Sequence, residues 1–136
     1  MSADLDRFFH PRTVAVIGAT DSEGKPGTGM WRRIKQWSDR HGAVCYPINP
    51  GRETVDDVKT YASILDIADD VDLAVILTND AMSSLGPVLE KGAAFAVIFG
   101  AGFSEAGAEG EARQHELVEL IRASNVRLLG PNTNLN

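Results

Sequence analysis

The sequence predicts an α/β fold in three layers, in which a doubly wound and mostly parallel sheet carries helices on both faces. Five short apolar segments rich in Val and Ile recur along the chain, at residues 13–17, 43–48, 72–77, 95–99 and 126–129. Nearly continuous apolar runs of this length are typical of strands that are buried on both faces. Amphipathic segments separate them, and such alternation of strand and helix indicates parallel strands joined by right-handed crossovers.

The first predicted helix covers residues 27–40. It places Met30, Ile34 and Trp37 at helical spacing on one face, with cationic residues on the other faces, as expected of a helix that packs on a sheet. A weaker sixth strand is predicted near residues 60–62. Right-handed crossovers then favour a sheet in the order 3-2-1-4-5-6, whose ligands bind beyond the carboxyl ends of the strands.

Two more helices are predicted in the second half of the chain. In residues 80–91, Leu85 and Leu89 share a face, but Pro87 is expected to delay the regular helix until its own position, because proline suits a first helical turn. Residues 108–124 carry a stripe of large apolar residues behind an acidic first turn, which favours a helix there.

The composition excludes several classes of function. A length of 136 residues fits one domain, and a formal net charge of −6 argues against a nucleic-acid partner. The single cysteine, Cys45, excludes an internal disulfide framework. No apolar run approaches the roughly 20 residues that cross a bilayer, and the charged N-terminus lacks a signal-peptide core, so a cytoplasmic protein is expected. Residues 1–52 sum to +3 and residues 53–136 to −9, which points to an anionic ligand on the first third.

The loop after the first strand has the composition of a phosphate-binding turn. It runs Gly18-Ala19-Thr20-Asp21-Ser22-Glu23-Gly24-Lys25-Pro26-Gly27-Thr28-Gly29. Glycines let backbone N–H groups approach a phosphate, and a helix N-terminus adds partial positive charge. The loop is not a Walker A motif, because five residues separate Gly18 from Gly24, and it departs from the dinucleotide fingerprint, because Thr20 replaces a glycine. An anion site is predicted, with a flexible surface loop as the alternative.

The loop after the second strand offers a cation. A domain that binds NAD usually places an acidic residue here for the ribose diol, whereas this chain has Asn49 and Arg52. An arginine suits a phosphorylated ribose, which means either the 2′-phosphate of NADP or the 3′-phosphate of coenzyme A. The alternative is a simple turn with a solvated arginine.

The later loops are small and polar. Thr78-Asn79-Asp80 can line a nucleotide site or cap a helix, and Gly100-Ala101-Gly102 offers backbone without bulk. The three histidines lack metal-ligand spacing, and Cys45 lies in an apolar strand, as a core residue would. We therefore expect neither a catalytic group nor a metal site in this chain.

Several segments together resemble a known family. Residues 8–19 (Phe-Phe-His-Pro-Arg-Thr-Val-Ala-Val-Ile-Gly-Ala) are followed in order by 46–50, 61–67, 71–76, 100–107 and 128–132. This set is similar to the CoA-binding domain of the NDP-forming acyl-CoA ligases, which include the succinyl-CoA synthetase α subunit and the fused acetate–CoA ligases. The resemblance covers nearly the whole chain and implies a Rossmann-like domain that binds coenzyme A.

The resemblance also relates parts of the ligand to residues. The first loop would hold the phosphates of CoA, and Arg52 would replace the basic residue of the family. Thr78 and Asn79 would flank the adenosine, while the glycines after the fifth strand and Asn132 would lie toward the pantetheine arm. The expected CoA-binding residues are Gly18, Thr20, Ser22, Gly24, Lys25, Gly27, Asn49, Arg52, Thr78, Asn79, Gly100, Ala101, Gly102 and Asn132.

Two departures from the family pattern stand out: Thr133 occupies the position of a usual cysteine, and Asn79-Asp80 replaces Pro-Ala. Residues 1–136 are expected to form one CoA-binding domain from the N-terminal part of a longer acyl-CoA ligase, in which the CoA thiol attacks an acyl phosphate. ATP or ADP would bind only in other domains or subunits, which are the expected partners, and homo-oligomers are left open. An NADP-binding oxidoreductase and a free-standing regulatory CoA-binding protein are the alternatives.

Overall fold

The computed structural model describes residues 9–78, 81–98, 115, 119 and 126–129. Its main sheet has five strands in the order β2-β1-β5-β6-β7, and all neighbours pair in parallel. Their bounds are β1 Thr13–Ile17, β2 Val44–Ile48, β5 Leu73–Ile76, β6 Phe95–Ile98 and β7 Arg127–Leu129. The predicted α/β class and the order of these five strands are confirmed.

The predicted sixth strand is only a single parallel bridge, between Ile48 and Tyr61 at the outer edge of β2. The chain turns away directly afterwards, because the Ser63 hydroxyl accepts the Leu65 N–H at 3.1 Å and begins the short 3-10 helix η1 (Ile64–Asp66). The structure thus shortens the strand expected at 60–62 to one residue.

A small antiparallel hairpin, which the apolar pattern of the sequence does not predict, precedes this bridge. It consists of β3 (Thr54–Val55) and β4 (Val58–Lys59). Asp56 and Asp57 form its two-residue turn with φ values of 48° and 65°. Positive φ at both central positions is the signature of a type I′ turn, which matches the twist of a hairpin.

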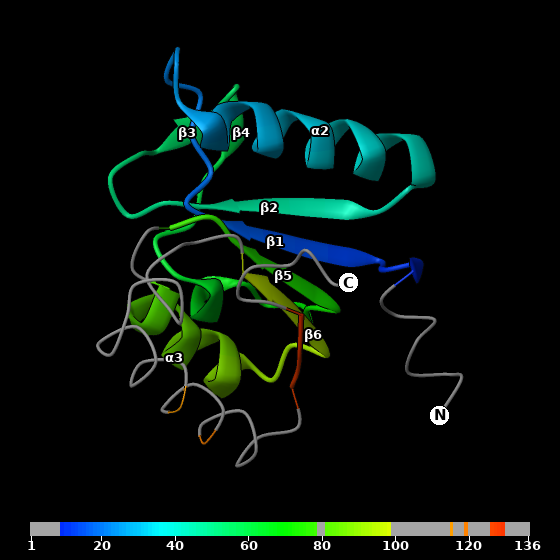
Figure 1. Ribbon diagram of the computed structural model, residues 1–136. Coiled ribbons are helices and arrows are strands. Elements are labelled where there is room, and N and C mark those ends of the chain that lie inside the picture. Colours follow the sequence, from blue (N-terminus) through cyan, green and yellow to red (C-terminus); the bar gives the residue numbers. More distant parts are fainter. Residues whose placement is uncertain (1–8, 79–80, 99–114, 116–118, 120–125, 130–136) are drawn as a thin grey trace.

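Helix α2 (Pro26–His41) covers one face of the sheet and α3 (Ala81–Lys91) the other, which gives the three layers (Figure 1). Pro26 suits the first turn of α2, and Gly42 ends it at a φ of 74° with its N–H on the Ser38 carbonyl. The inward face of α2 is shifted by one position from the predicted one. Trp31 and Ser38 are fully buried and Thr28 is nearly so, whereas the predicted stripe of Met30, Ile34 and Trp37 is only half-buried.

The predicted delay of the second helix is wrong, since α3 runs without a break from Ala81 with Pro87 inside it. Gly86 precedes the proline and has no Cβ to clash with its ring, which removes part of the usual penalty. Gly92, at a φ of 79°, ends the helix. The helix predicted at 108–124 lies outside the described residues except for His115 and Glu119, which are both helical.

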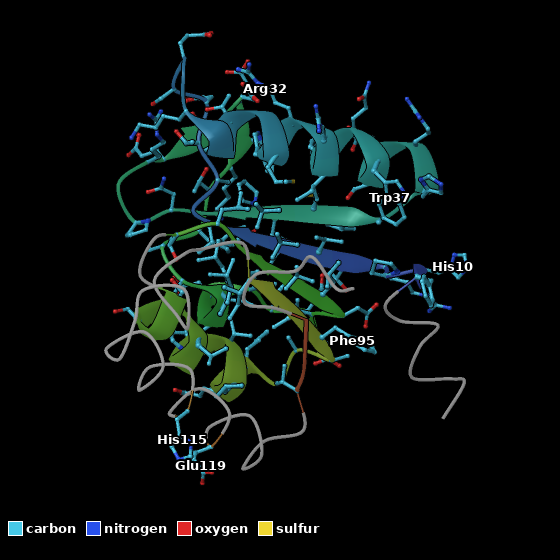
Figure 2. The ribbon with its side chains drawn as sticks, viewed as in Figure 1. His10, Arg32, Trp37, Phe95, His115 and Glu119 are labelled. Atoms are coloured by element: carbon cyan, nitrogen blue, oxygen red, sulfur yellow. The ribbon has the colours of Figure 1, made fainter. Side chains whose placement is uncertain are left out.

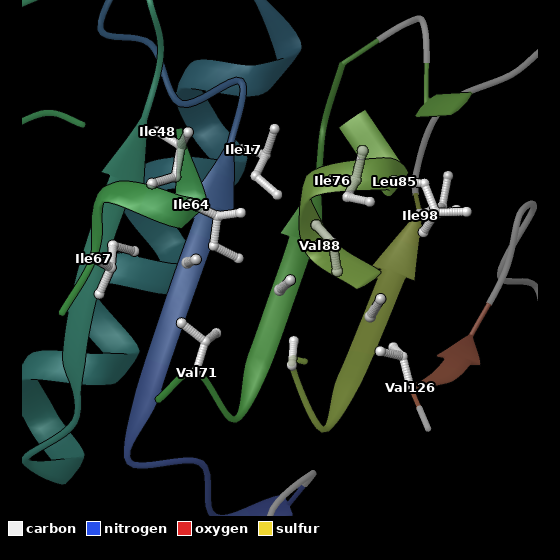
Figure 3. Close-up of a cluster of buried hydrophobic side chains, with 14 residues drawn as sticks. Ile17, Ile48, Ile64, Ile67, Val71, Ile76, Leu85, Val88, Ile98 and Val126 are labelled. Carbon is white, nitrogen blue, oxygen red and sulfur yellow. The ribbon is translucent and has the colours of Figure 1, made fainter. Parts of the chain in front are cut away.

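The core lies on both faces of the sheet. Toward α3 and η1, a larger cluster gathers Ile17, Ile76, Ile98 and Leu85 (Figure 3). Toward α2, a smaller cluster surrounds Trp31. Each large buried apolar side chain stabilises the fold by about 1.5–3 kcal/mol. Burial on both faces explains why the strands are apolar without alternation.

No helix in the described part of the chain is both long and apolar enough to span a membrane. The parallel strands place Ile17, Ile48 and Ile76 at the same edge of the sheet, because each is the last residue of its strand. The loops that leave this edge build the site.

Candidate functional site

The first loop starts at Gly18, directly after β1. Its N–H donates to the carbonyl of Ile48, 2.9 Å away at the end of β2. Its φ of +90° lies in the left-handed region, which favours glycine, and an added Cβ would lie 3.0 Å from Cγ2 of Thr78. Gly18 therefore allows the loops after β1, β2 and β5 to meet at one point.

Side chains within the first loop fix its conformation. The Ser22 N–H donates to the Thr20 hydroxyl at 3.1 Å, and the Thr28 hydroxyl donates to the Ser22 carbonyl at 2.5 Å. Thr20 and Thr28 are both buried. Lys25 follows at the N-cap position of α2 with its side chain exposed. The loop is thus held at both ends, and its one lysine faces solvent beside the start of a helix.

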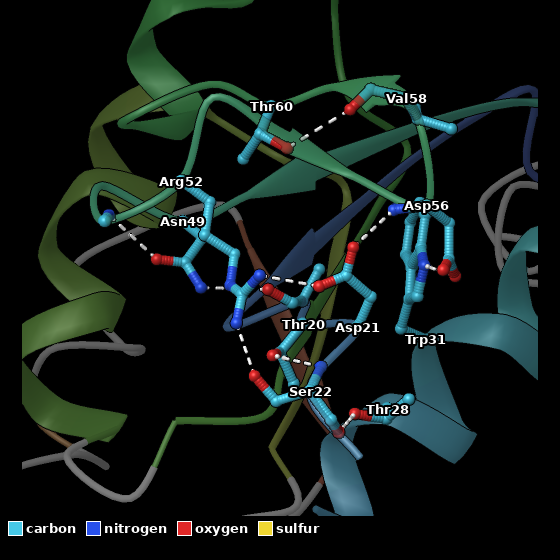
Figure 4. Close-up of polar contacts among 12 residues, drawn as sticks. Thr20, Asp21, Ser22, Thr28, Trp31, Asn49, Arg52, Asp56, Val58 and Thr60 are labelled. Atoms are coloured by element: carbon cyan, nitrogen blue, oxygen red, sulfur yellow. Dashed lines mark hydrogen bonds and ion pairs between the residues drawn. The ribbon is translucent and has the colours of Figure 1, made fainter.

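The second loop reaches across to the first (Figure 4). Nδ2 of Asn49 donates to the Ala19 carbonyl at 2.9 Å. Arg52 extends further along the first loop, where Nη1 lies 2.6 Å from Oδ1 of Asp21 and Nη2 donates to the Ser22 hydroxyl. The cation predicted after the second strand therefore lies directly against the predicted phosphate loop.

The hairpin joins this network from the other side. The Asp56 N–H donates to Oδ2 of Asp21 at 2.8 Å, and the Asp56 carboxylate accepts from Nε1 of Trp31 at 2.9 Å and from two nitrogens of Arg32 at 3.0 Å. The hydrogen bond from Arg32, with help from Trp31, holds the pKa of Asp56 below its ordinary value of 3.8. Asp56 is therefore a charged link between α2 and the first loop.

A cavity of about 380 Å³ opens where β1, β2 and β5 end. This is the switch point of a doubly wound sheet, where ligands bind in such folds. Three predicted residues line it, namely Gly18, Asn49 and Thr78. The lining residues that were not predicted as binding residues are Ile17, Ile48, Pro50, Ala62, Ser63, Ile64, Ser83, Ser84 and Pro87.

The missed residues have identifiable signals. Ser63 comes two residues after the bridge at Tyr61, so the rule that ligands bind beyond strand ends applies to it as well. Ser83 and Ser84 were missed because α3 was expected to start later. On the helix, the Ser84 hydroxyl lies 2.8 Å from that of Thr78, and the two form one wall of the cavity.

The remaining predicted residues fall into three groups. Thr20, Ser22 and Arg52 belong to the polar network that Asn49 connects to the cavity. Gly24, Lys25 and Gly27 lie around the first turn of α2. Five residues lie outside the described part of the chain, namely Asn79, Gly100, Ala101, Gly102 and Asn132.

The environment of Cys45 differs from that of a reactive cysteine. Cys45 is buried, and burial raises the pKa of its thiol to about 11, far from the range of reactive cysteines. No cluster of three metal-ligating side chains occurs in the described ranges. Figure 2 places His10 and His115 far apart at opposite ends of the view. The groups that the described site offers are the Arg52 guanidinium and the hydroxyls that line the cavity.

Known proteins match this chain over most of its length. The family described as CoA binding domain matches residues 12–135. The chain is 38% identical over 132 residues to acetate–CoA ligase [ADP-forming] II of Archaeoglobus fulgidus, a match that covers 96% of this chain and 19% of the relative. It is 39% identical over 130 residues to the alpha subunit of acetate–CoA ligase [ADP-forming] II of Pyrococcus furiosus, with coverages of 94% and 28%.

A solved structure shows the same fold. The crystal structure of PH0766 from Pyrococcus horikoshii OT3 superimposes with a TM-score of 0.86 at 38% identity, covering 94% of this chain and 29% of that one. The chain therefore spans less than a third of the length of each of these three relatives.

Proposed function

The chain belongs to the CoA-binding domain family and is homologous to the ADP-forming acyl-CoA ligases, and on that premise we propose that its cavity and first loop together bind coenzyme A. The observation that carries this proposal is the position of Arg52. It crosses from the second loop to the glycine-containing first loop, and Asn49 of the same second loop lines the cavity at the switch point. A phosphorylated nucleotide needs a cation and a glycine-containing loop for its phosphates and a cavity for its base.

The cavity suits the adenosine part of the ligand. Its volume of about 380 Å³ lies within the range of roughly 300–1,000 Å³ typical of small-molecule sites. Apolar side chains from β1, β2 and η1 supply flat contact area, and the hydroxyls of Ser63, Thr78 and Ser84 supply hydrogen-bonding groups. Purine recognition needs this combination of apolar surface and a few polar groups.

Arg52 suits the 3′-phosphate of CoA. A guanidinium has five N–H donors, and the contacts with Asp21 and Ser22 use two of them. The side chain is 35% exposed, so a ligand can reach it. The start of α2, next to Lys25, suits the diphosphate, because a helix N-terminus attracts anions.

The proposed role in catalysis is to present the CoA thiol. In a ligase of this type, the thiol sulfur would attack the carbonyl carbon of an acyl phosphate, the new S–C bond would form, and the C–O bond to phosphate would break. Inorganic phosphate would leave, and the thiol proton would pass to solvent or phosphate. This chain would supply binding and orientation, while groups outside it would make the acyl phosphate.

Isothermal calorimetry with CoA and dephospho-CoA tests the proposal. We expect the wild-type chain to prefer CoA by about 10- to 100-fold, because a charge-assisted contact to the 3′-phosphate contributes about 1.5–3 kcal/mol. Arg52→Gln should remove this preference and leave dephospho-CoA binding within twofold. Arg33→Gln, which removes an exposed cation of α2, is the matched control and should leave the preference intact.

Two results would contradict the proposal. An absence of CoA binding by the wild-type chain would overturn it outright. Binding of NADPH without any response to CoA would assign the Arg52 site to a 2′-phosphate and favour an oxidoreductase domain instead.

A further inference from the structure

The cation of the proposed phosphate site, Arg52, already forms an ion pair with a carboxylate of the protein. Oδ1 of Asp21 lies 2.6 Å from Nη1 of Arg52, and the two side chains are only 28% and 35% exposed. A guanidinium and a carboxylate in contact have no net charge. A ligand phosphate that approaches Arg52 therefore meets a neutral pair, with the negative member close by.

Asp21 is held in this position from a second side. Its other oxygen, Oδ2, accepts the Asp56 N–H at 2.8 Å, and Asp56 is in turn fixed by Trp31 and Arg32. Arg52 of the second loop on one side and the hairpin turn on the other thus fix the carboxylate (Figure 4). It cannot move away from an incoming phosphate without breaking the bond to the hairpin.

Arg52 does not depend on Asp21 alone for its position. Its Nη2 donates to the Ser22 hydroxyl, and its backbone N–H lies 3.3 Å from the Asn49 carbonyl. Loss of the Asp21 charge would therefore leave the guanidinium beside the first loop. A substitution of Asp21 therefore tests the effect of its charge on the ligand, because Ser22 and Asn49 keep Arg52 in place.

We propose that Asp21 is a specificity-determining residue that competes with the ligand for Arg52 and so limits the preference for a 3′-phosphate. This inference rests on the proposed function. A phosphomonoester carries about −1.5 to −2 charges at pH 7, so a fixed carboxylate that contacts Arg52 repels a phosphate bound to the same guanidinium. Such competition would weaken binding enough for the product acyl-CoA to dissociate.

The test is Asp21→Asn, with calorimetry on CoA and dephospho-CoA. We expect CoA to bind about tenfold more tightly and dephospho-CoA to change by less than threefold, so that the preference for the 3′-phosphate rises. Asp39→Asn is the matched control, because it also removes a carboxylate paired with a cation, at 2.5 Å from Lys35 on α2. It should change neither affinity by more than twofold.

Two further variants keep the test decisive. Asp21→Ser removes the charge with a smaller side chain, so it should give the same gain if the asparagine variant fails to fold. In an Arg52→Gln background, Asp21→Asn should no longer alter the preference, because the guanidinium for which the two anions compete is absent.

The outcomes distinguish this inference from the proposed function. If the wild-type chain binds CoA with a 3′-phosphate preference and Asp21→Asn leaves or lowers that preference, the competition is refuted and the proposed function stands. If the wild-type chain does not bind CoA, both fail together. A gain for CoA that persists without Arg52 would also overturn the inference, since the effect would then be general repulsion.

Discussion

The two sides of the candidate site, which are the charged network between the loops and the hydroxyl-lined wall of the cavity, are built from different chemistry. On the charged side, Arg52, Asp21 and Asp56 cross-link the loops of β1 and β2 through ionic hydrogen bonds. On the hydroxyl side, Thr78, Ser83 and Ser84 belong to β5 and α3 and present neutral groups. Under the proposed function the two sides would have separate tasks, because fixed charges would discriminate between anions, whereas small hydroxyls would shape the volume and hydrogen-bond a neutral base.

The largest effect is expected where the two sides meet, at Gly18. Gly18→Ala would force an alanine to a φ of +90° and place its Cβ 3.0 Å from Thr78, which we expect to cost about 3 kcal/mol of the free energy of unfolding. Gly24→Ala is the control, because its φ is +81° but nothing lies within 4 Å of the added Cβ. It should cost about 1–2 kcal/mol from the left-handed conformation alone. If urea unfolding showed equal losses of unfolding free energy for the two variants, the close contact between Gly18 and Thr78 would have no energetic effect.

A smaller effect is expected on the hydroxyl side. Ser84→Ala removes the 2.8 Å contact with the Thr78 hydroxyl and should lower the free energy of unfolding by about 1 kcal/mol. Calorimetry should show CoA and dephospho-CoA weakened equally, by about threefold, because this wall would contact the part that both ligands share. A selective loss of CoA would contradict the division into two sides.

The smallest effect concerns pH and the charged side. Hydrogen bonds from Arg32 and Trp31 lower the folded-state pKa of Asp56 below its ordinary value of 3.8. The ionised carboxylate therefore stabilises the fold at pH values above 3.8, and this contribution is lost as the pH falls through the lower folded-state pKa. Asp56→Asn should therefore reduce the loss of unfolding free energy between pH 5 and about pH 3. Urea unfolding followed by Trp31 fluorescence, in a Trp37→Phe background, measures the difference. Identical pH profiles would show that the Asp56 links contribute nothing.

Much of this arrangement is predictable from local sequence. Gly18 and Asn49 directly follow β1 and β2, and Thr78 comes two residues after the end of β5. Each of these strands is recognisable by its apolar run, and the strand-end rule brings the three residues to one cavity. The position of Arg52 beside the first loop follows from the same rule. The binding roles of these residues, and of those outside the described ranges, stay predictions.

The charged network could not be predicted in the same way. It depends on the hairpin, whose strands have two residues each, too short for a periodic signal. The Trp31–Asp56 contact joins residues 25 positions apart. The consecutive Asp56 and Asp57 between valines are the one local hint, because aspartate tolerates the left-handed conformation of a type I′ turn.

The buried thiol has a practical consequence for optical work on this domain. Cys45 is the single cysteine of the chain, and we expect slow reaction with maleimides at neutral pH, because its thiol is buried in the core and burial raises the thiol pKa to about 11. The chain therefore needs no cysteine removed before a labelling site is introduced. A fluorophore attached through Ser83→Cys, at the exposed rim of the cavity, would report ligand arrival from one defined position.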